Sequence, residues 1–269
     1  MLGIIHNEQK VVEEILENKT LIVSMSNTID ILIKYYYLRN RDIDKLELLY
    51  TILDNIKACN LETFKASKCE EMITNRIDKF YKTIRKYGEE NVKLNIIDKV
   101  VITKAEVELI NTYDDKKVQN VMFIMLVYAK ITNQLNNNES YWLNQSLTNI
   151  MKEAKVTDKT RKTDIFHSLY KEGAISTGNR IDRVSIKVNY AYEDSEEAIV
   201  ITDFDGCIHY WLMYKGEKWK RCKECGKWIK IYGVKDNSKK YCKGCAKVIQ
   251  QEQKNDYKKR EKEKKQKTP

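Results

Sequence analysis

The chain is poor in residues that interrupt helices. Its 269 residues include one proline and nine glycines. Proline removes a backbone hydrogen-bond donor and glycine has a low helix propensity, so their scarcity favours a mainly helical fold. A chain of this length also exceeds the average size of one domain, which predicts two or three compact units.

The sequence also lacks a long hydrophobic run. Its longest apolar stretch, residues 121–129, is far shorter than the roughly 20 residues that a membrane-spanning helix needs. The first residues do not have the pattern of a secretory signal. Cys59, Cys69 and Cys207 lie outside the motif described below, and this odd remainder fits a reducing compartment better than a disulfide framework. We therefore expect a cytoplasmic protein without a membrane partner.

Histidine is scarce as well, because the chain has only His6, His167 and His209. The sequence shows neither a nucleophile and base pattern nor a glycine-rich phosphate loop. Asp203 and Asp205, in an Asp-Phe-Asp-Gly motif, suggest either a metal-dependent active site or a hydrogen-bonded turn. The turn is favoured because no second carboxylate cluster accompanies the motif. We expect a protein without enzymatic activity.

The strongest chemical signal lies near the C-terminus, where two Cys-x-x-Cys pairs are separated by sixteen residues. The pairs are Cys222 with Cys225 and Cys242 with Cys245. Four thiolates at this spacing are typical of a structural zinc site, because they surround one Zn²⁺ tetrahedrally and leave no position for water or substrate. We predict one structural Zn²⁺ in a zinc ribbon at residues 215–248. Free or disulfide-bonded cysteines are the alternative interpretation.

Positive charge is concentrated around this motif. The whole chain has a net charge of +10, and residues 215–269 alone contain 20 Lys or Arg and 7 Asp or Glu. Basic side chains that alternate with aromatic ones can neutralise phosphates while the rings stack on bases. The predicted nucleic-acid contacts of the ribbon are Lys220, Arg221, Lys227, Lys230, Lys239 and Lys240. Residues 249–269 are predicted to form a basic tail that is helical or disordered.

Residues 1–95 have the pattern of a helical bundle domain. Apolar residues recur at helical spacing in four segments between residues 7 and 87, as in Ile29, Leu32 and Ile33. Aromatic residues at such spacing, including the tyrosines at 35–37, are more often part of a core than of a base-stacking surface. The sequence predicts no catalytic arrangement in this domain.

Residues 96–214 change from helical to alternating periodicity. Two helical segments, a turn and a helix at residues 158–171 precede a short pair of strands, which is the order of a winged helix-turn-helix domain with a small β-ribbon. The helix after the turn is the usual groove reader in such domains. The candidate contacts are Lys159, Arg161, Lys162 and His167 on that helix, and Arg180 and Arg183 in the wing. A winged helix that binds protein is the alternative.

Several short segments are spread over the whole chain: Met1-Leu-Gly-Ile-Ile, Asn27-Thr-Ile-Asp-Ile-Leu-Ile-Lys-Tyr-Tyr, Val127-Tyr-Ala-Lys, Ile186-Lys-Val-Asn, Arg221-Cys-Lys-Glu-Cys-Gly-Lys and Lys240-Tyr-Cys-Lys-Gly-Cys-Ala-Lys. Together they resemble a family of uncharacterised proteins from phages and prophages of clostridia and related Gram-positive bacteria. The resemblance implies a winged-helix-like middle and a C-terminal four-cysteine zinc ribbon. It implies no particular activity.

The sequence as a whole predicts a phage-type nucleic-acid-binding protein that acts in transcription regulation or replication, with DNA rather than RNA as the expected partner. The expected fold is mainly α, with a helical bundle at 1–95, a winged-helix-like domain at 96–214, the zinc ribbon at 215–248 and the tail at 249–269. The alternative function is a zinc-containing interaction module that docks on or inhibits a phage or host protein complex. The sequence does not predict an oligomeric state.

Overall fold

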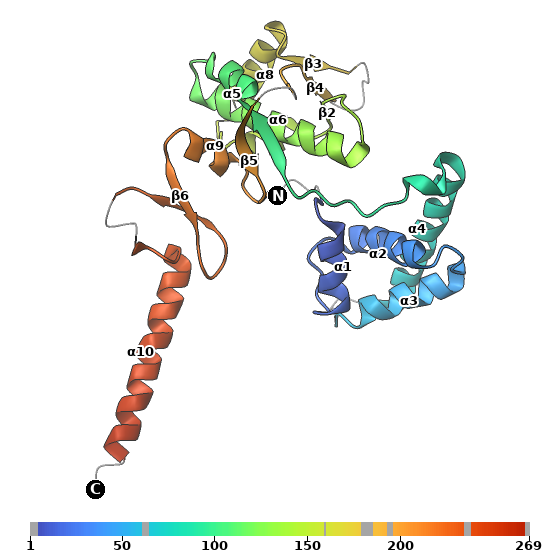
Figure 1. Cartoon of the computed structure of the whole chain (residues 1–269). Helices are drawn as coiled ribbons and strands as arrows, with labels where there is room; N and C mark the ends of the chain where they lie inside the picture. Colours follow the sequence, from blue (N-terminus) through green and yellow to red (C-terminus); the bar gives the residue numbers. More distant parts are fainter. Residues whose placement is uncertain are drawn as a thin grey trace. The chain divides into compact units, whose positions relative to one another are not determined.

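The chain divides into two compact units in a computed structural model (Figure 1). The structure describes residues 5–60, 65–158, 160–178, 185–192, 196–233 and 238–266, and the side chains of the last helix up to residue 260. One unit is Gly3–Asp98 with Ile131–Glu139, and the other contains Lys99–Lys130 and Ser140–Pro269. Among the helices in these described ranges, none is both long and apolar enough to cross a membrane.

The N-terminal unit consists of helices, and capping side chains precede the first three of them. They are α1 (Glu8–Leu16), α2 (Met25–Arg39), α3 (Lys45–Lys57), α4 (Ala66–Tyr87) and the 3₁₀ turn η1 (Glu89–Asn91). Asn7, Ser24 and Asp44 precede the first three helices, and each side chain accepts a hydrogen bond from a backbone N–H of the first turn. Helix α4 ends at Gly88, whose φ of +88° lies in the left-handed region that glycine adopts easily. These α-helices are the four segments that the apolar periodicity predicts.

The apolar faces of these helices meet in one core. Ile29 of α2 and Ile52 of α3 are completely buried there. Tyr37 is buried beside them and meets Phe80 of α4 edge-on, with ring centroids 5.2 Å apart. The tyrosines at 35 and 36 are half-buried. The tyrosines at 35–37 of α2 therefore contribute to packing, as their helical spacing predicts.

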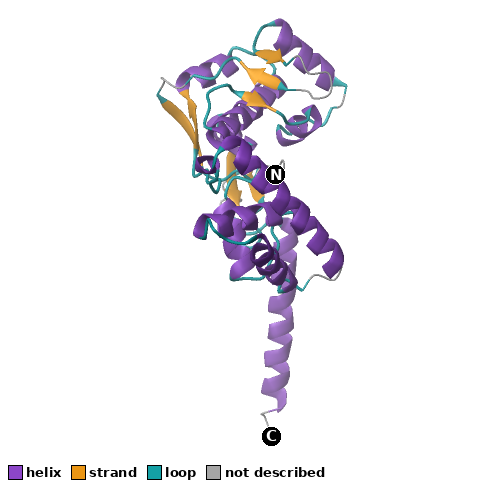
Figure 2. Cartoon of the chain, turned by 90° about the vertical axis from the view of Figure 1, so that its right-hand side faces the viewer, coloured by secondary structure: helices purple, strands orange, loops and turns teal. Residues whose placement is uncertain are grey.

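The second unit combines helices with short antiparallel strands (Figure 2). Its helices are α5 (Lys104–Asn111), α6 (Lys116–Asn136) up to Lys130, α7 (Leu147–Glu153), α8 (Arg161–Lys171), α9 (Ile208–Tyr214) and α10 (Lys243–Gln266). Its strands are β1 (Val100–Thr103), β2 (Trp142–Leu143), β3 (Ile175–Thr177), β4 (Ile186–Val188), β5 (Glu197–Ile201), β6 (Lys218–Arg221) and β7 (Trp228–Ile231). The described chain is thus mainly helical with small antiparallel sheets, as the sequence predicts.

Helix α6 is the centre of the second unit. Its residues 121–129 are all buried, which explains an apolar run without a polar face. Phe123 stacks on Trp211 of α9, with ring centroids 5.3 Å apart. The Tyr190 hydroxyl, just after β4, donates a hydrogen bond to the Met122 carbonyl over 2.8 Å. Helix α6 therefore joins α9 and the segment after β4 to a common core.

Three strands of this unit form a sheet in the order β2-β4-β3. Ile186 of β4 pairs with Leu143 of β2 on one side and with Thr177 of β3 on the other. Strand β1 pairs with β5 in a separate antiparallel sheet. The predicted strand pair corresponds to β3 and β4. The sequence pattern does not predict β1 or β2, because runs of two to four residues are too short to show a period.

One buried carboxylate fixes the start of α5. Glu106 is completely buried, and it accepts hydrogen bonds from the backbone N–H groups of Thr103 (2.7 Å) and Tyr192 (2.9 Å). Lys130 of α6 forms an ion pair with it at 2.8 Å. Burying a charge is costly unless it is paired and hydrogen-bonded, and Glu106 is both. This pair therefore connects the start of α5 to α6 and has a structural role.

The division into two compact units is coarser than the predicted division into four domains. The N-terminal unit ends at Asp98, close to the predicted boundary after residue 95. Residues 215–248 and 249–269, predicted as a separate ribbon and tail, belong to the same compact unit as the middle of the chain. The reason is that the β6–β7 hairpin packs against α9 and the loop that precedes it.

Candidate metal centre and basic surface

The four predicted metal ligands come together beside the β6–β7 hairpin. Cys222 follows β6, Cys225 lies in the turn to β7, and Cys242 and Cys245 lie at the start of α10. Their Sγ atoms are all within 4.8 Å of one another, so the cluster could bind one metal ion. The Sγ atoms of Cys225 and Cys242 are 3.7 Å apart, much longer than the about 2.05 Å of a disulfide bond.

Backbone N–H groups stabilise negative charge on two of these sulfur atoms. Cys242 N–H donates to Cys222 Sγ over 3.2 Å, and Cys245 N–H donates to Cys242 Sγ over 3.5 Å. Backbone hydrogen bonds, first of all from Cys225, lower the pKa of Cys222 to about 6. The backbone N–H of Cys245 lowers the pKa of Cys242 in the same way.

The fourth thiol shows what a cation would contribute. The side chains of Cys225 and Cys242 raise the pKa of Cys245 to about 12, because neighbouring sulfurs compete for negative charge. A bound cation removes this conflict by neutralising all four thiolates together. Four soft sulfur donors within tetrahedral reach of one point are the ligand set that zinc prefers. The residues present therefore fit a thiolate-bound metal.

The two faces of the β6–β7 hairpin carry different side chains and pack against different parts of the unit. Its cross-strand pairs are Lys218 with Ile231, Trp219 with Lys230, Lys220 with Ile229, and Arg221 with Trp228. Side chains that pair directly lie on the same face of a sheet. One face therefore carries Ile229 and Ile231, which pack with Tyr241 on the cysteine cluster. The other face carries both tryptophans, and we call it the docking face.

The docking face packs against the buried His209 of α9. The His209 ring stacks on Trp228 with centroids 4.6 Å apart and meets Trp219 edge-on at 4.5 Å. Its Nε2 lies 2.7 Å from Lys155 Nζ, and its Nδ1 lies 2.8 Å from the Gly206 carbonyl oxygen. A neutral ring satisfies both contacts, with Nδ1–H donating to the carbonyl and Nε2 accepting from the ammonium. Burial accordingly lowers the pKa of His209 to about 4.

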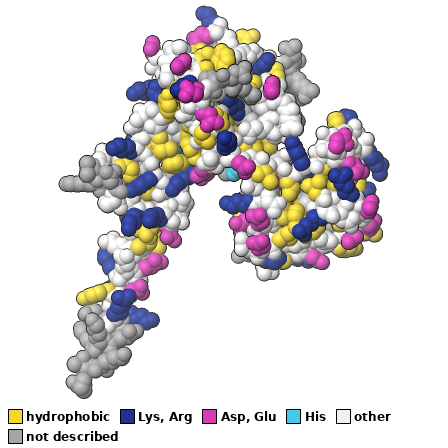
Figure 3. Space-filling model, in the orientation of Figure 1, with side chains coloured by type: hydrophobic (Ala, Val, Ile, Leu, Met, Phe, Trp, Pro, Cys, Tyr) yellow, Lys and Arg dark blue, Asp and Glu magenta, His cyan; other side chains and the backbone are white. Residues whose placement is uncertain are grey.

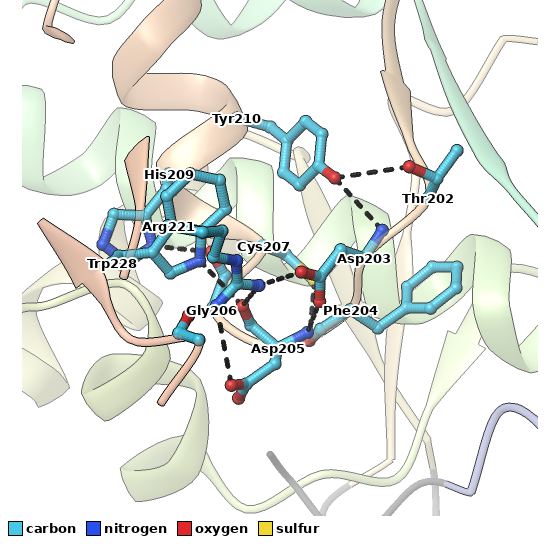
Figure 4. A network of polar contacts seen from close by, with 11 residues as sticks. Thr202, Asp203, Phe204, Asp205, Gly206, Cys207, His209, Tyr210, Arg221 and Trp228 are labelled. Atoms are coloured by element: carbon cyan, nitrogen blue, oxygen red, sulfur yellow. Dashed lines mark hydrogen bonds and ion pairs between the residues drawn. The ribbon is translucent and has the colours of Figure 1, made fainter. Parts of the chain in front are cut away.

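The Asp-Phe-Asp-Gly motif binds the hairpin (Figure 4). Asp203 Oδ1 accepts a hydrogen bond from the Asp205 backbone N–H over 2.9 Å, which confirms the predicted turn. Arg221 forms ion pairs with both carboxylates, and its Cζ lies 4.1 Å from the centroid of the Trp228 ring. Trp228 Nε1–H donates to the Asp205 carbonyl over 2.9 Å. These carboxylates therefore hold an arginine of the hairpin.

Gly206 allows this close approach. Its φ is +76°, and a Cβ atom at this position would lie 2.9 Å from His209 Nδ1 and 3.1 Å from the Trp228 ring. Both the backbone conformation and the available space therefore favour glycine. The glycine of the motif lets the loop, the histidine and the hairpin pack together.

The predicted nucleic-acid contacts of the hairpin fall into two groups. Arg221 is engaged as described, and Lys230 Nζ forms a 2.8 Å ion pair with Glu217. Lys220 lies half-buried on the face that covers the cysteine cluster. The exposed members are Lys227, Lys239 and Lys240. The backbone places two of them at the cluster, since Cys222 N–H donates to the Lys227 carbonyl and Lys223 N–H to the Lys240 carbonyl.

The predicted contacts in the middle of the chain are placed less favourably for phosphate. Arg161, in the first turn of α8, forms a 2.5 Å ion pair with Asp115. Lys162 is half-buried and His167 is exposed. Lys159, Arg180 and Arg183 lie outside the described residues. Within the described part of α8, the exposed face is therefore polar but only weakly basic.

Sequence reasoning missed the partners of the docking face, Lys155, His209 and Glu217. Lys155 and His209 are 54 residues apart in the chain, so no local spacing reveals their contact. The hairpin sequence did contain one indication that a second packing surface exists. The hairpin sequence places tryptophans on one side and isoleucines on the other, and a small strand pair with large apolar side chains on both faces needs two packing surfaces.

Comparisons with protein-family models, with curated proteins and with solved structures give no match. The resemblance to phage and prophage proteins therefore stays a prediction. The site has to be interpreted from its own geometry, charge and chemistry.

Proposed function

We propose that the protein binds nucleic acid, with DNA as the partner, and acts without enzymatic activity in phage-type transcription regulation or replication. The observation that carries this proposal is the connectivity α6, β2, α7, α8, β3, β4, with β4 between β2 and β3. A winged helix has this order of elements and this strand pairing. In such a domain the helix after the turn, which corresponds to α8, enters a DNA groove.

The exposed face of α8 supports a role in reading bases. Ile165, Phe166 and Leu169 are buried, and this leaves Asp164 and His167 exposed on the opposite side. A carboxylate repels phosphate, but it accepts a hydrogen bond from the amino group of cytosine in the major groove. This face therefore suits sequence preference more than general affinity.

The C-terminal end supports a role in general affinity. One structural Zn²⁺ at the cysteine cluster would hold the hairpin, since zinc binding in small modules is worth on the order of 10 kcal/mol. Exposed lysines such as Lys227 and Lys240 surround that cluster. Lysines that neutralise phosphates provide affinity that is independent of sequence and sensitive to salt. Figure 3 shows Lys and Arg side chains over this part of the chain.

A binding assay with duplex DNA, single-stranded DNA and RNA at several salt concentrations tests the proposal. We expect binding to duplex DNA that weakens with salt, with a slope of log K against log salt near −5 if about six phosphates are neutralised. The absence of binding to every probe would overturn the proposal.

A pair of variants separates the two roles. Asp164→Ala should change the preference among duplex sequences and leave the salt slope unchanged, because it removes a base contact. Lys227→Gln combined with Lys240→Gln should weaken binding to all sequences equally and reduce the slope by about two. Equal behaviour of the two variants would contradict the assignment of α8 to base reading.

A protein-binding function is the second candidate, and one observation in the N-terminal unit favours it. Leu46 and Tyr50 lie one turn apart on α3 and are 61% and 54% exposed. A pair of large apolar side chains on one helix face is a suitable anchor for a partner protein. A single host or phage protein that copurifies stoichiometrically after nuclease treatment, and is lost in the Leu46→Ser/Tyr50→Ser variant, would favour this alternative.

A further inference from the structure

Between residues 243 and 258, helix α10 separates its charges between two sides. Lys243, Lys247, Lys254 and Lys258 follow one another at intervals of four, seven and four residues. At roughly 100° per residue, these positions fall within a sector of about 60°. All four side chains are exposed, and in the described part of the chain the structure pairs none of them with a carboxylate. We call this row the lysine stripe.

Between residues 243 and 258, the acidic residues of the helix lie away from the stripe. Glu252 and Asp256 are one turn apart, and the same geometry places them roughly opposite the lysines. Over residues 243–258, one side of α10 therefore presents cations while carboxylates occupy the other. Figure 3 shows both kinds of side chain on the described part of the helix. A helix that is merely solvated does not need this separation.

The position of the stripe is fixed by the cysteine cluster. Lys243 lies between two of the metal ligands, Cys242 and Cys245, and the second of these is in the first turn of α10. A metal ion in the cluster therefore holds the base of the helix. From there the stripe extends about 22 Å to Lys258, at about 1.5 Å per residue.

The composition of α10 identifies the kind of partner. A helix that lies on a membrane needs an apolar side opposite its cations. The large apolar residues of the described helix, Val248, Ile249 and Tyr257, point in three different directions about its axis. A stripe of lysines without an apolar side fits a row of phosphates. About 22 Å corresponds to the length of about six nucleotides of one strand, at about 3.4 Å each.

We propose that the lysine stripe of α10 is a backbone-binding surface for nucleic acid, in which a metal ion at the cysteine cluster orients the helix and the four lysines contact phosphates along about six nucleotides of one strand. This inference rests on the proposed function and assigns its sequence-independent contacts to one side of one helix. The stripe contacts phosphates and contributes no preference for particular bases.

Two double variants of the full-length, metal-loaded protein test the proposal. Lys254→Gln/Lys258→Gln removes two stripe lysines. Lys259→Gln/Arg260→Gln removes two cations that lie off the stripe in the same stretch of helix, one on either side of it. Both variants lower the net charge by the same amount. Glutamine keeps the helix propensity close to that of lysine or arginine. Circular dichroism and metal content serve to check that both remain folded.

The measured quantity is affinity for duplex and single-stranded DNA of arbitrary sequence as a function of salt. We expect the stripe variant to lose roughly tenfold in affinity and to reduce the salt slope by about two, because two phosphate contacts are lost. The off-stripe variant should lose much less. Equal losses of DNA affinity in the two variants would contradict a specific role of the lysine stripe, because affinity would then depend only on net charge. The proposal that the protein binds nucleic acid would remain. If the unaltered protein binds no probe, or binds only anionic vesicles, both proposals fail.

Discussion

The N-terminal unit and the metal hairpin are stabilised by different means. The four helices of the N-terminal unit bury a large set of aliphatic side chains, among them Leu32, Ile52 and Ile73. In the described hairpin, the buried apolar cluster consists of Cys222, Ile229 and Ile231. Burial of apolar area drives folding in the first case. The second has little of it, and a metal ion bound by the four cysteines would contribute further stability.

This difference has a functional consequence. A unit that folds around its own core buries many of its large side chains, as it does with Tyr37. A hairpin held by four thiolates can leave long polar side chains on its surface, and exposed residues such as Lys227 and Lys240 illustrate this. A metal ion bound by these four cysteines would make a small segment rigid without occupying its surface. Each of the following predictions tests part of this contrast.

Metal removal should have the largest effect. A chelator should unfold the hairpin and the base of α10 while α1–α4 keep their helical signal, because structural metal binding in small modules is worth on the order of 10 kcal/mol. Limited proteolysis and the fluorescence of Trp219 and Trp228 would follow the hairpin, and circular dichroism would follow the helices. A hairpin that stays protease-resistant without metal would show that, contrary to our expectation, its stability does not depend on metal binding.

A cysteine pair provides the matched control for this experiment. Cys225→Ser removes one ligand of the cluster and should reduce metal content and hairpin protection together. Cys59→Ser changes a half-buried thiol in the other unit and should leave both unchanged. Loss of metal in both variants would mean that the bound metal is not held by the cluster.

Core truncation should have the next largest effect, and it should differ between the regions. Ile52→Ala leaves a cavity in a completely buried site and should lower the free energy of unfolding of the N-terminal unit by roughly 3 kcal/mol. Ile229→Ala, at a position that is 9% exposed, should cost about 1 kcal/mol or less while metal is bound. Urea unfolding of the metal-loaded protein measures both. Equal costs would show that the hairpin depends on its apolar cluster as much as the bundle does.

The sequence predicts those features of both regions that depend on residues close together in the chain. The helices of the N-terminal unit follow from local periodicity and from caps such as Ser24 and Asp44, which are readable from neighbouring residues. The cysteine cluster follows from spacing alone, because each Cys-x-x-Cys turn brings two sulfurs to one point. Both are local rules, and both held.

The docking face could not be predicted because its partners are distant in the chain. Arg221 and Lys230 have the composition expected of phosphate contacts, yet they pair with Asp203 and Glu217. Basic side chains give the same sequence signal whether their carboxylate partner is internal or their phosphate partner is external. Only the three-dimensional arrangement of the loop before α9, which carries Asp203, and of the residue before β6, Glu217, distinguishes the two cases.

Acidification should weaken the docking of the hairpin more than it weakens the N-terminal unit. Burial lowers the pKa of His209 from an ordinary 6.5 to about 4, so the undocked or unfolded protein binds a proton at a pH at which the docked protein does not. The stabilising contribution is therefore complete above about pH 6.5 and is lost as the pH falls toward 4. Lys155 Nζ and the Arg221 guanidinium also oppose a charged ring, whereas the Gly206 carbonyl and Asp205 favour it.

The measurement is the pH dependence of hairpin stability in the original protein and in His209→Gln, which does not titrate. The original protein should lose on the order of 3 kcal/mol across this window, given about 1.4 kcal/mol per unit of pKa difference. The variant should be less stable near neutral pH and less sensitive to acid. Metal content has to be constant over the pH values compared. Identical pH profiles would show that His209 is not part of the docking equilibrium.

The smallest effect should come from the Asp203 carboxylate. Asp203→Asn keeps the side-chain oxygen that accepts the Asp205 N–H and removes the charge that pairs with Arg221. The Asp203 side chain is 45% exposed, so solvent weakens this ion pair and the cost should be below about 1 kcal/mol. Asp205→Asn is the control with a still smaller cost, because its carboxylate lies 3.8 Å from Arg221 and is 65% exposed.

The size of this last effect distinguishes two ways of holding the hairpin. Residue 205 binds Arg221 and Trp228 through its backbone carbonyl, at 2.8 and 2.9 Å, and neither variant removes that oxygen. The stacking of His209 on Trp228 also remains. If rings and backbone hold the docking face, Trp228 fluorescence and metal-loaded stability should hardly change in Asp203→Asn. A loss comparable to that of metal removal would instead mean that one surface charge pair joins the hairpin to its unit.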